Sequence, residues 1–442
     1  GDSLKRNGES DVSDVDLTDD DREYENDPDE LNDIDVFNEI NSIMTDFDSD
    51  PQSIIGDIVS VLMHSPNRAI DWIFTTDVPL IFCEHLGVCP EAMIGLARIA
   101  TPSLQFPQEL ITPELTSLLL EFIANGLDSA LHVAAVLSFQ YPWFRNCLVA
   151  KNIWKSLIQT INSVNYHSSV ELIQASKRDE VSYMEFIDIT MFTSEAINLY
   201  TNHQLDVSNL DVTNHLDGFF TIAREQENLE LLITPEFFKV MCSLSLTTGF
   251  LSLVVDYLDL ISSVESEELI SRTNQLEVLD LFAFILKTGS PNIMKRISKV
   301  FLRMVANNSG CIENFVSNAF ILMLFELLDA ENFTTKCESL YIITEIICCT
   351  NSFVLELVIQ HRIYEQFAWY LTAGTDKLRK SIVLAVCRMI VLYTDVVGKM
   401  CEAGFLDALL EVDSDASEGS DFKESAQQLL MTLEDYNLSQ SD

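Results

Sequence analysis

The sequence predicts an all-α protein, a solenoid of helical repeats with a period near 42 residues, preceded by a disordered acidic N-terminal tail. Three observations support this fold class. Hydrophobic residues make up 48% of the chain, but 14 Gly and 11 Pro in 442 residues are few for the turns of a sheet protein. From residue 51 onward, apolar residues recur at helical spacing and no segment alternates as a strand would. Two helix patterns also repeat along the chain.

The first 32 residues have the composition of a disordered segment, with high charge, few aromatic residues and no sustained period. Residues 16–30, DLTDDDREYENDPDE, hold nine carboxylates in fifteen positions. Residues 1–50 carry −16 of the net charge of −43. We expect this segment to act as an acidic arm that contacts either a basic client or the body of its own chain. The residues of the acidic arm that we expect to make this contact are Asp19, Asp20, Asp21, Glu23 and Glu25.

Residues 33–50 are predicted to form an amphipathic acidic helix or cap. Phe37, Ile40, Met44 and Phe47 recur at intervals of three and four residues, which places them on one helix face. This stripe fits either a helix that caps the fold or a docking motif.

The predicted solenoid covers residues 51–436, and residues 437–442 are expected to be a disordered C-terminus. Four helical segments share one apolar face and each contains a Ser, at positions 298, 339, 381 and 425, with separations of 41, 42 and 44 residues. A second helix series lies between them, at residues 318–327, 361–370 and 403–412. Ser129 lies close to four periods before Ser298. Two series that keep step are what a two-helix repeat unit requires.

This period and helix pairing resemble the armadillo family, of which HEAT repeats are near neighbours. The resemblance covers about residues 52–436; it is clearest from Pro291 onward, and the register is lost between residues 163 and 285. It implies a right-handed α-solenoid superhelix whose inner helices bind extended peptides or partner domains. The order of an acidic segment followed by AIDWIFTTDVPLIFCEHLGVCPEAMIGLARIA, residues 69–100, is similar to the serum amyloid A-like 1 family of armadillo proteins. That second resemblance implies an intracellular, nuclear, non-enzymatic protein.

The sequence contains no signature of catalysis or of a resident cofactor. It has no glycine-rich phosphate loop, no nucleophile elbow and no H-E-x-x-H pair, and its seven His residues are scattered. We therefore expect no enzyme and no cofactor. The ten Cys residues form no C-x-x-C pair and no signal peptide is evident, so we expect a reducing, intracellular location, cytoplasmic and/or nuclear.

Two segments resemble metal sites but lack essential features. The stretch CEHLGVC at residues 83–89 has no fourth zinc ligand. The acidic loop of residues 413–424 places oxygen ligands at five positions of a calcium loop, but its turn glycine, Gly419, is one position late and Ser420 replaces an apolar residue. A solvated loop between two helices explains it better, and calcium binding stays an alternative.

Basic residues cluster in the C-terminal repeats of this acidic chain. They recur at matching repeat positions, so stacked repeats would align them into a strip. The strip fits either a solvated face or a binding site for an acidic segment. We call it the basic strip, and its residues are Lys295, Arg296, Lys299, Arg303, Lys336, Lys377, Arg379 and Lys380.

These features predict a non-catalytic scaffold or adaptor that binds protein partners on its solenoid surface. The alternative is an acidic chaperone or transport carrier for basic clients such as ribosomal proteins or histones. The acidic arm would then attract the client; in the first case it would compete with an acidic partner for the basic strip. The negative charge makes direct nucleic acid binding unexpected, and the longest charge-free stretches, of sixteen residues, are too short for membrane insertion.

Overall fold

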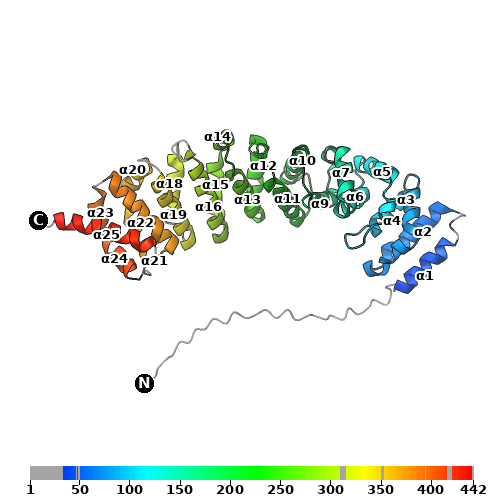
Figure 1. The fold of residues 1–442 in the computed structure, drawn as a ribbon, viewed down its shortest axis with the longest axis horizontal. Helices are drawn as coiled ribbons and strands as arrows, with labels where there is room; N and C mark the ends of the chain where they lie inside the picture. Colours follow the sequence, from blue (N-terminus) through cyan, green and yellow to red (C-terminus); the bar gives the residue numbers. More distant parts are fainter. Residues whose placement is uncertain are drawn as a thin grey trace, which may run out of the picture. The chain divides into compact units, whose positions relative to one another are not determined.

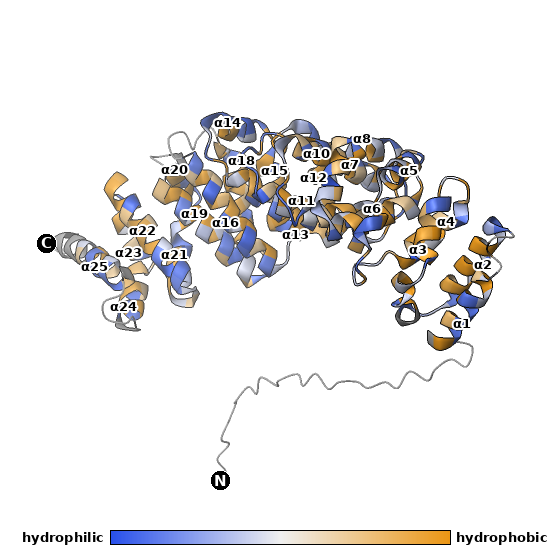
Figure 2. Ribbon diagram, turned by 45° about the vertical axis from the view of Figure 1, so that its right-hand side comes forward, coloured by the Kyte–Doolittle hydropathy of each residue, from blue (hydrophilic) through white to orange (hydrophobic). Residues whose placement is uncertain are grey.

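A computed structural model of the chain describes residues 33–45, 47, 50–308, 315–349, 353–393, 395–415 and 421–440. Within these residues the secondary structure is helical, with no strand (Figure 1). Many helices carry hydrophobic and hydrophilic residues on different sides (Figure 2). The predicted acidic tail, with the acidic arm, lies outside the described residues, as do residues 416–420 of the predicted acidic loop and the last two residues of the chain.

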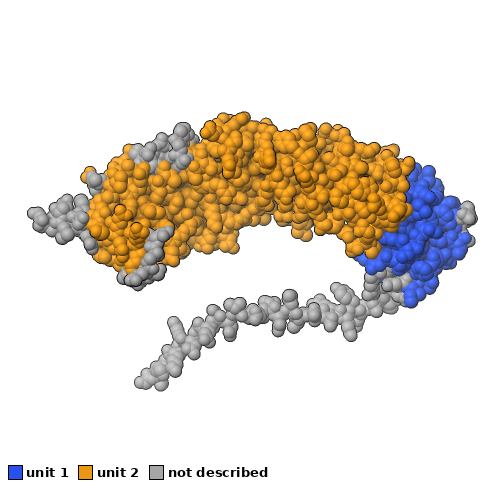
Figure 3. Space-filling model, viewed as in Figure 1, with its two compact units in different colours: residues 1–99 blue, residues 100–442 orange. Residues whose placement is uncertain are grey.

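The chain divides into two compact units, unit 1 up to residue 99 and unit 2 from residue 100 (Figure 3). Unit 1 contains two short 3-10 helices, η1 and η2, and four α-helices. Their bounds are α1 (Asp33–Met44), α2 (Pro51–His64), η1 (Asn67–Ile70), η2 (Ile73–Thr75), α3 (Val78–His85) and α4 (Pro90–Ile99).

The helix predicted from the acidic stripe is α1, which packs against α2 and η1. Val36 and Ile40 are its buried residues, while Phe37 lies at the edge and meets the ring of Trp72 at 4.9 Å. The buried face therefore shares Ile40 with the predicted stripe but has Val36 in place of Phe37. Because α1 buries its apolar side within unit 1, this structure favours the capping interpretation of the stripe.

Unit 2 is a succession of helices joined by short connections. Its first half contains η3 (Gln108–Leu110), α5 (Pro113–Ala124), α6 (Asp128–Gln140), α7 (Pro142–Ala150), α8 (Ile153–Thr160), α9 (Tyr166–Ser176), α10 (Tyr183–Thr201), α11 (Asn209–Arg224), α12 (Pro235–Ser245), η4 (Thr248–Phe250) and α13 (Leu251–Ser262). Its second half contains α14 (Glu267–Gln275), α15 (Val278–Thr288), α16 (Pro291–Asn307), α18 (Asn318–Leu327), α19 (Phe333–Cys349), α20 (Phe353–Gln360), α21 (Tyr364–Ala373), α22 (Asp376–Leu392), α23 (Val396–Glu402), α24 (Phe405–Asp415) and α25 (Asp421–Gln440).

One helix of each repeat packs beside its counterpart in the next. The helices α6, α9, α11, α13, α16, α19, α22 and α25 contact one another in this order, and we call this row the helix ladder. In Figure 1 the ladder from α6 to α19 runs along the lower side of unit 2, with α5, α7, α10, α12 and α14 above it. A second row passes from α5 through α8 and α10 to α12. The predicted all-α solenoid of armadillo/HEAT-like repeats is thus confirmed.

The repeating Ser residues belong to the helix ladder. Ser298 and Ser339 are fully buried and Ser381 is nearly so. The Ser298 hydroxyl donates to the carbonyl of Met294 one turn earlier, and Ser381 donates to Glu345 of the neighbouring helix. A small residue at this position lets the ladder helices approach closely. The hydroxyls of Ser298 and Ser381 are satisfied, whereas that of Ser339 is buried without a hydrogen-bond partner among the described residues.

The structure also supplies the ladder helices of the region where the sequence register was lost. They are α9, α11 and α13. The pattern of α11 is obscured by His215, which is fully buried between the hydroxyls of Tyr166 and Thr193, at 2.8 and 3.0 Å. A buried polar residue satisfied by distant partners looks like a surface position in the sequence.

Side chains also join neighbouring ladder helices directly. His132 of α6 lies between two acceptors, Glu171 of α9 at 2.8 Å from Nδ1 and the carbonyl of Ala100 at 3.1 Å from Nε2. Both contacts are satisfied only when both ring nitrogens carry a proton. The hydrogen bond to Glu171 accordingly raises the pKa of His132, and Asp128 adds to this effect, while burial opposes it.

We expect the contribution of His132 to stability to depend on pH. Its folded-state pKa lies above the unfolded value of about 6.5, so its contribution is complete below that pH and is lost as pH rises through the folded-state pKa. His132→Asn should therefore lower the free energy of unfolding by about 1 kcal/mol near pH 5.5 and by less near pH 8.5. Chemical denaturation at both pH values measures this, and an equal loss at both would contradict the assignment.

Candidate functional site: a groove on the basic strip

The basic strip lies on three consecutive ladder helices, α16, α19 and α22. Lys295 and Lys299 are exposed on α16, and Lys336 of α19 is partly exposed. Within the described residues none of these three lysines makes an ion pair, so their charges are open to a partner.

Both arginines of the strip on α16 are already paired. Arg296 meets Asp256 of α13 at 2.7 Å and also donates to the hydroxyl of Ser252. Arg303 meets Asp259 of α13 at 2.8 Å. Two of the predicted basic-strip residues are therefore neutralised, because their side chains pair with carboxylates of α13 and join that helix to α16. Sequence reasoning missed this because the two carboxylates lie about one repeat earlier in the chain.

The remaining strip residues lie at the start of α22. Arg379 donates to the carbonyls of Leu371 and Thr372, at 2.9 and 2.7 Å, and so caps the last turn of α21. Lys380 is exposed. Lys377 places its amine 3.4 Å from the ring centroid of Tyr341, a cation–π contact. Burial lowers the pKa of Lys377; the negative charge of Glu338 opposes this effect, and the positive charge of Lys299 adds to it.

A cavity of about 90 Å³ opens between these three helices, and we call it the α16–α22 groove. The groove has lysine amines from two helices, an apolar and aromatic wall, and one carboxylate. Its lining residues are Lys295, Phe333, Thr334, Cys337, Glu338, Tyr341, Thr375, Lys377 and Leu378. The sequence pointed to its lysines. It gave no signal for Phe333 and Tyr341, because only the stacking of α19 between α16 and α22 brings them to the same place.

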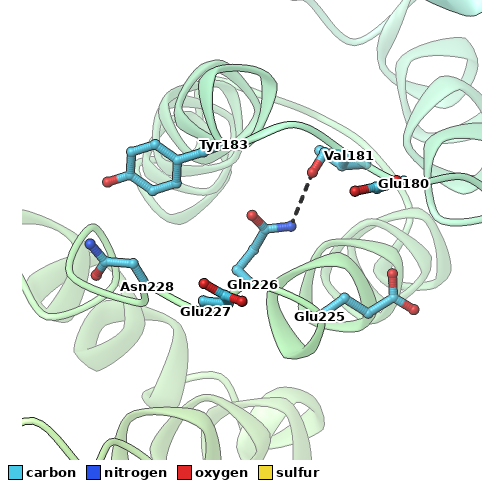
Figure 4. A pocket seen from close by; sticks show the side chains of 7 residues that line it. All are labelled: Glu180, Val181, Tyr183, Glu225, Gln226, Glu227 and Asn228. Atoms are coloured by element: carbon cyan, nitrogen blue, oxygen red, sulfur yellow. Dashed lines mark hydrogen bonds between the residues drawn. The ribbon is translucent and has the colours of Figure 1, made fainter.

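A second and larger cavity, of about 380 Å³, lies between the α9–α10 and α11–α12 connections (Figure 4). We call it the acidic cleft. Its lining residues are Glu180, Val181, Tyr183, Glu225, Gln226, Glu227 and Asn228. Figure 4 shows Gln226 reaching toward Val181, and its amide donates to the Val181 carbonyl at 3.4 Å. The cleft thus combines three carboxylates with polar amides, which suits a cationic group.

A buried ion pair supports one wall of the acidic cleft. Arg145 of α7 is almost fully buried; it donates to Glu185 of α10 at 2.9 Å and to the carbonyl of Glu180 at 3.2 Å. Burial raises the pKa of Glu185, and the charge of Arg145 acts against this effect. Neither residue was singled out from the sequence, because each lies in an otherwise apolar helical pattern.

The two metal-like segments do not gain support from the geometry. No group of three or more His, Cys, Asp or Glu in the described part of the chain is arranged to hold a metal ion. Burial raises the pKa of Cys83 to about 12, which keeps its thiol protonated. Cys89 is buried and donates its thiol hydrogen to Glu91.

As for a lipid bilayer, none of the described helices combines the length and the apolar character required to cross one.

Comparison with known proteins identifies the fold. No protein-family model and no curated protein sequence matches the chain. Among solved structures, the crystal structure of an engineered protein is similar over 91% of this chain and 99% of its own, with a TM-score of 0.55 and 14% identity. A computationally designed armadillo repeat protein for modular peptide recognition covers 54% of this chain and 97% of its own, with a TM-score of 0.43 and 17% identity. UNC-45 from Drosophila melanogaster covers 90% of this chain and 58% of its own, with a TM-score of 0.46 and 12% identity.

The first of these similarities shows that the fold described above also occurs in a solved structure, and at such low identity the similarity concerns the fold alone. Since no curated sequence matches, the resemblance to the serum amyloid A-like 1 family stays a prediction.

We expect Arg145→Met to destabilise the protein by about 3–5 kcal/mol at neutral pH, because it leaves the Glu185 carboxylate buried without its counter-charge. Protonation of Glu185 would relieve this cost, so the loss should shrink as pH falls. A matched control is Arg303→Met, which removes a solvent-exposed pair and should cost at most about 1 kcal/mol. Denaturation of both variants measures the difference, and equal costs would show that the buried pair contributes no more than the exposed one.

Proposed function

We propose that the chain is a non-catalytic interaction scaffold or adaptor that binds acidic segments of protein partners along α16, α19 and α22. One observation carries the proposal. In a chain with a net charge of −43, Lys295 and Lys299 stand exposed without an ion pair beside a groove whose opposite wall carries Lys377. Uncompensated cations in an acidic protein are a local attraction for carboxylates.

The strength of this site would come from several contacts acting together. A single exposed ion pair contributes about 0–1 kcal/mol, so one lysine would not hold a partner. The packed ladder helices fix the backbone positions of these lysines, so their charges stay on one surface, and the gain from several contacts must exceed the cost of ordering each flexible side chain. The negative body of the protein would meanwhile repel acidic partners elsewhere and thereby restrict them to this surface.

A peptide of the sequence of residues 16–30 is a suitable acidic probe, with nine carboxylates. We expect the double substitution Lys295→Glu and Lys299→Glu to weaken binding of the labelled peptide at least tenfold, which corresponds to a loss of about 1.4 kcal/mol of binding free energy. Fluorescence anisotropy at low salt measures this. The control is Lys151→Glu with Lys239→Glu, which changes the net charge equally at exposed lysines of the α7 end and α12. Equal weakening by both pairs would mean that only net charge matters and would sink the proposed site.

The acidic arm enters the proposal as an internal competitor for the same surface. We expect removal of residues 1–32 to raise the affinity for the added peptide at about 20 mM salt. The gain should shrink at about 300 mM salt, because the Debye length falls below 10 Å. Titration of the peptide into the full and truncated chains tests this. Unchanged affinity on truncation would exclude the competition and would leave the scaffold proposal standing.

A second candidate function, a chaperone or carrier of basic clients, is supported by the acidic cleft and by the overall negative charge. The two functions differ in the surface that binds. Replacing Glu180, Glu225 and Glu227 with Gln would weaken capture of a basic client in the carrier and leave acidic peptide binding unchanged in the scaffold. We place either function in the cytoplasm or nucleus, in keeping with the unpaired thiols of the described cysteines.

A further inference from the structure

Two aromatic side chains lie exposed beside the α16–α22 groove. Phe333, the first residue of α19, is 46% exposed, and Trp369 of α21 is 54% exposed. Their rings meet edge to face with centroids 5.9 Å apart, and Trp369 also contacts Tyr370 at 4.6 Å. By contrast, Trp154 is buried to 1% exposure. Exposed aromatic side chains that neighbouring rings hold in one position are typical of the residues that contribute most of the binding energy at protein interfaces.

This aromatic pair is continuous with the lysines, because Phe333 itself lines the groove together with Lys295 and Lys377. An apolar side chain that enters the groove would therefore contact rings while its neighbours in sequence meet lysine amines. With a volume of about 90 Å³, the groove is small and suits a single side chain.

Apart from its two lysines, Lys295 and Lys377, the lining of the groove is neutral except for one group. Burial raises the pKa of the Tyr341 phenol to about 12 and that of the Cys337 thiol to about 11, so both stay protonated at neutral pH. Leu378 contributes a buried apolar surface.

The exception is Glu338. Its carboxylate lines the groove, makes no ion pair within the described residues, and has one buried oxygen, Oε2, without a hydrogen-bond partner. A carboxylate at this position repels a second carboxylate that enters, whereas Lys295 and Lys299 attract carboxylates outside. Lys295 and Lys299 thus favour negative groups along α16, while Glu338 disfavours a second carboxylate beside it.

We propose that the groove recognises an acidic segment that contains one aromatic residue, with the ring packed against Phe333 and Trp369 and the flanking carboxylates on Lys295 and Lys299. Glu338 is the specificity-determining residue that excludes a negatively charged side chain from the ring position. This inference rests on the proposed function and narrows the class of partner. Residues 16–30 of this chain have the required pattern, since Tyr24 lies between Glu23 and Glu25, so this peptide serves as the probe.

The experiment compares peptides on the same full-length protein, so that any competition from its own N-terminal segment cancels in the ratio. The labelled peptide 16–30 is titrated beside its Tyr24→Ser and Tyr24→Glu forms. We expect the Tyr24→Ser peptide to bind the protein about tenfold more weakly than the parent peptide, because it lacks the aromatic ring that packs in the groove. On Trp369→Ala the ratio between the two peptides should fall to near one.

Two further variants complete the cycle. Trp143→Ala removes another partly exposed Trp, at 40% exposure on α7, and should leave the peptide ratio unchanged. Glu338→Gln keeps the shape of the groove and should improve binding of the Tyr24→Glu peptide severalfold more than that of the parent peptide, because the repulsion is gone. Circular dichroism confirms that each variant retains its helices.

The outcomes separate the two proposals. Equal affinities for the Tyr24 and Tyr24→Ser peptides, both weakened by the lysine reversal, would overturn the aromatic anchor and leave the scaffold intact. No binding of any peptide would overturn both. If the parent peptide fails to bind and the full-length protein instead dimerises through Trp369, measured by sedimentation and lost in Trp369→Ala, the surface would be an interface between two copies and the inference would be wrong.

Discussion

Each ladder helix packs against the ladder helices one repeat before and one repeat after it, and against other helices of its own repeat. A single two-helix unit cannot enclose a core, so the repeats of unit 2 depend on this side-by-side packing. The helices must therefore present a similar face at a nearly constant separation in sequence. Buried Ser residues such as Ser298 and Ser339 satisfy that constraint, since they are small enough for close approach, and the Ser298 hydroxyl bonds its own helix. The contacts of His132 with Glu171 and of Arg296 with Asp256 join ladder helices in the same spacing.

The same packing decides which charges remain open to a partner. Arg296 and Arg303 face carboxylates of α13 and stabilise the junction, and Arg379 caps α21. Lys295 and Lys299 lie on the same helix as the two arginines, but no carboxylate of the described residues pairs with them. The arginines of α16 thus stabilise its packing against α13, while the lysines of the same helix leave their positive charges exposed. This division suits the two side chains, because guanidinium groups form directional pairs while ammonium groups on flexible stems act as mobile point charges.

The two cavities of unit 2 have opposite electrostatic character. The acidic cleft is formed by connections between helices and lies over the buried Arg145–Glu185 pair, whereas the α16–α22 groove is formed by the ladder helices themselves. A surface built on packed helices holds its side chains more precisely than one built on loops. This difference is the physical reason why we propose selective recognition at the groove and not at the cleft.

The sequence by itself determined the all-α class, the period near 42 residues and the identity of most ladder helices in the C-terminal half, because the apolar pattern there is regular and uninterrupted. It also located the basic strip. It lost the register around α11, where His215 is a buried polar residue whose partners, Tyr166 and Thr193, lie far away in the chain. Only the tertiary structure decided which strip residues are neutralised, and only it placed Phe333, Tyr341 and Trp369 beside the lysines. The reason is the same in each case: helical periodicity is encoded within one helix, but the pairing of charges and rings depends on which faces of different repeats come into contact.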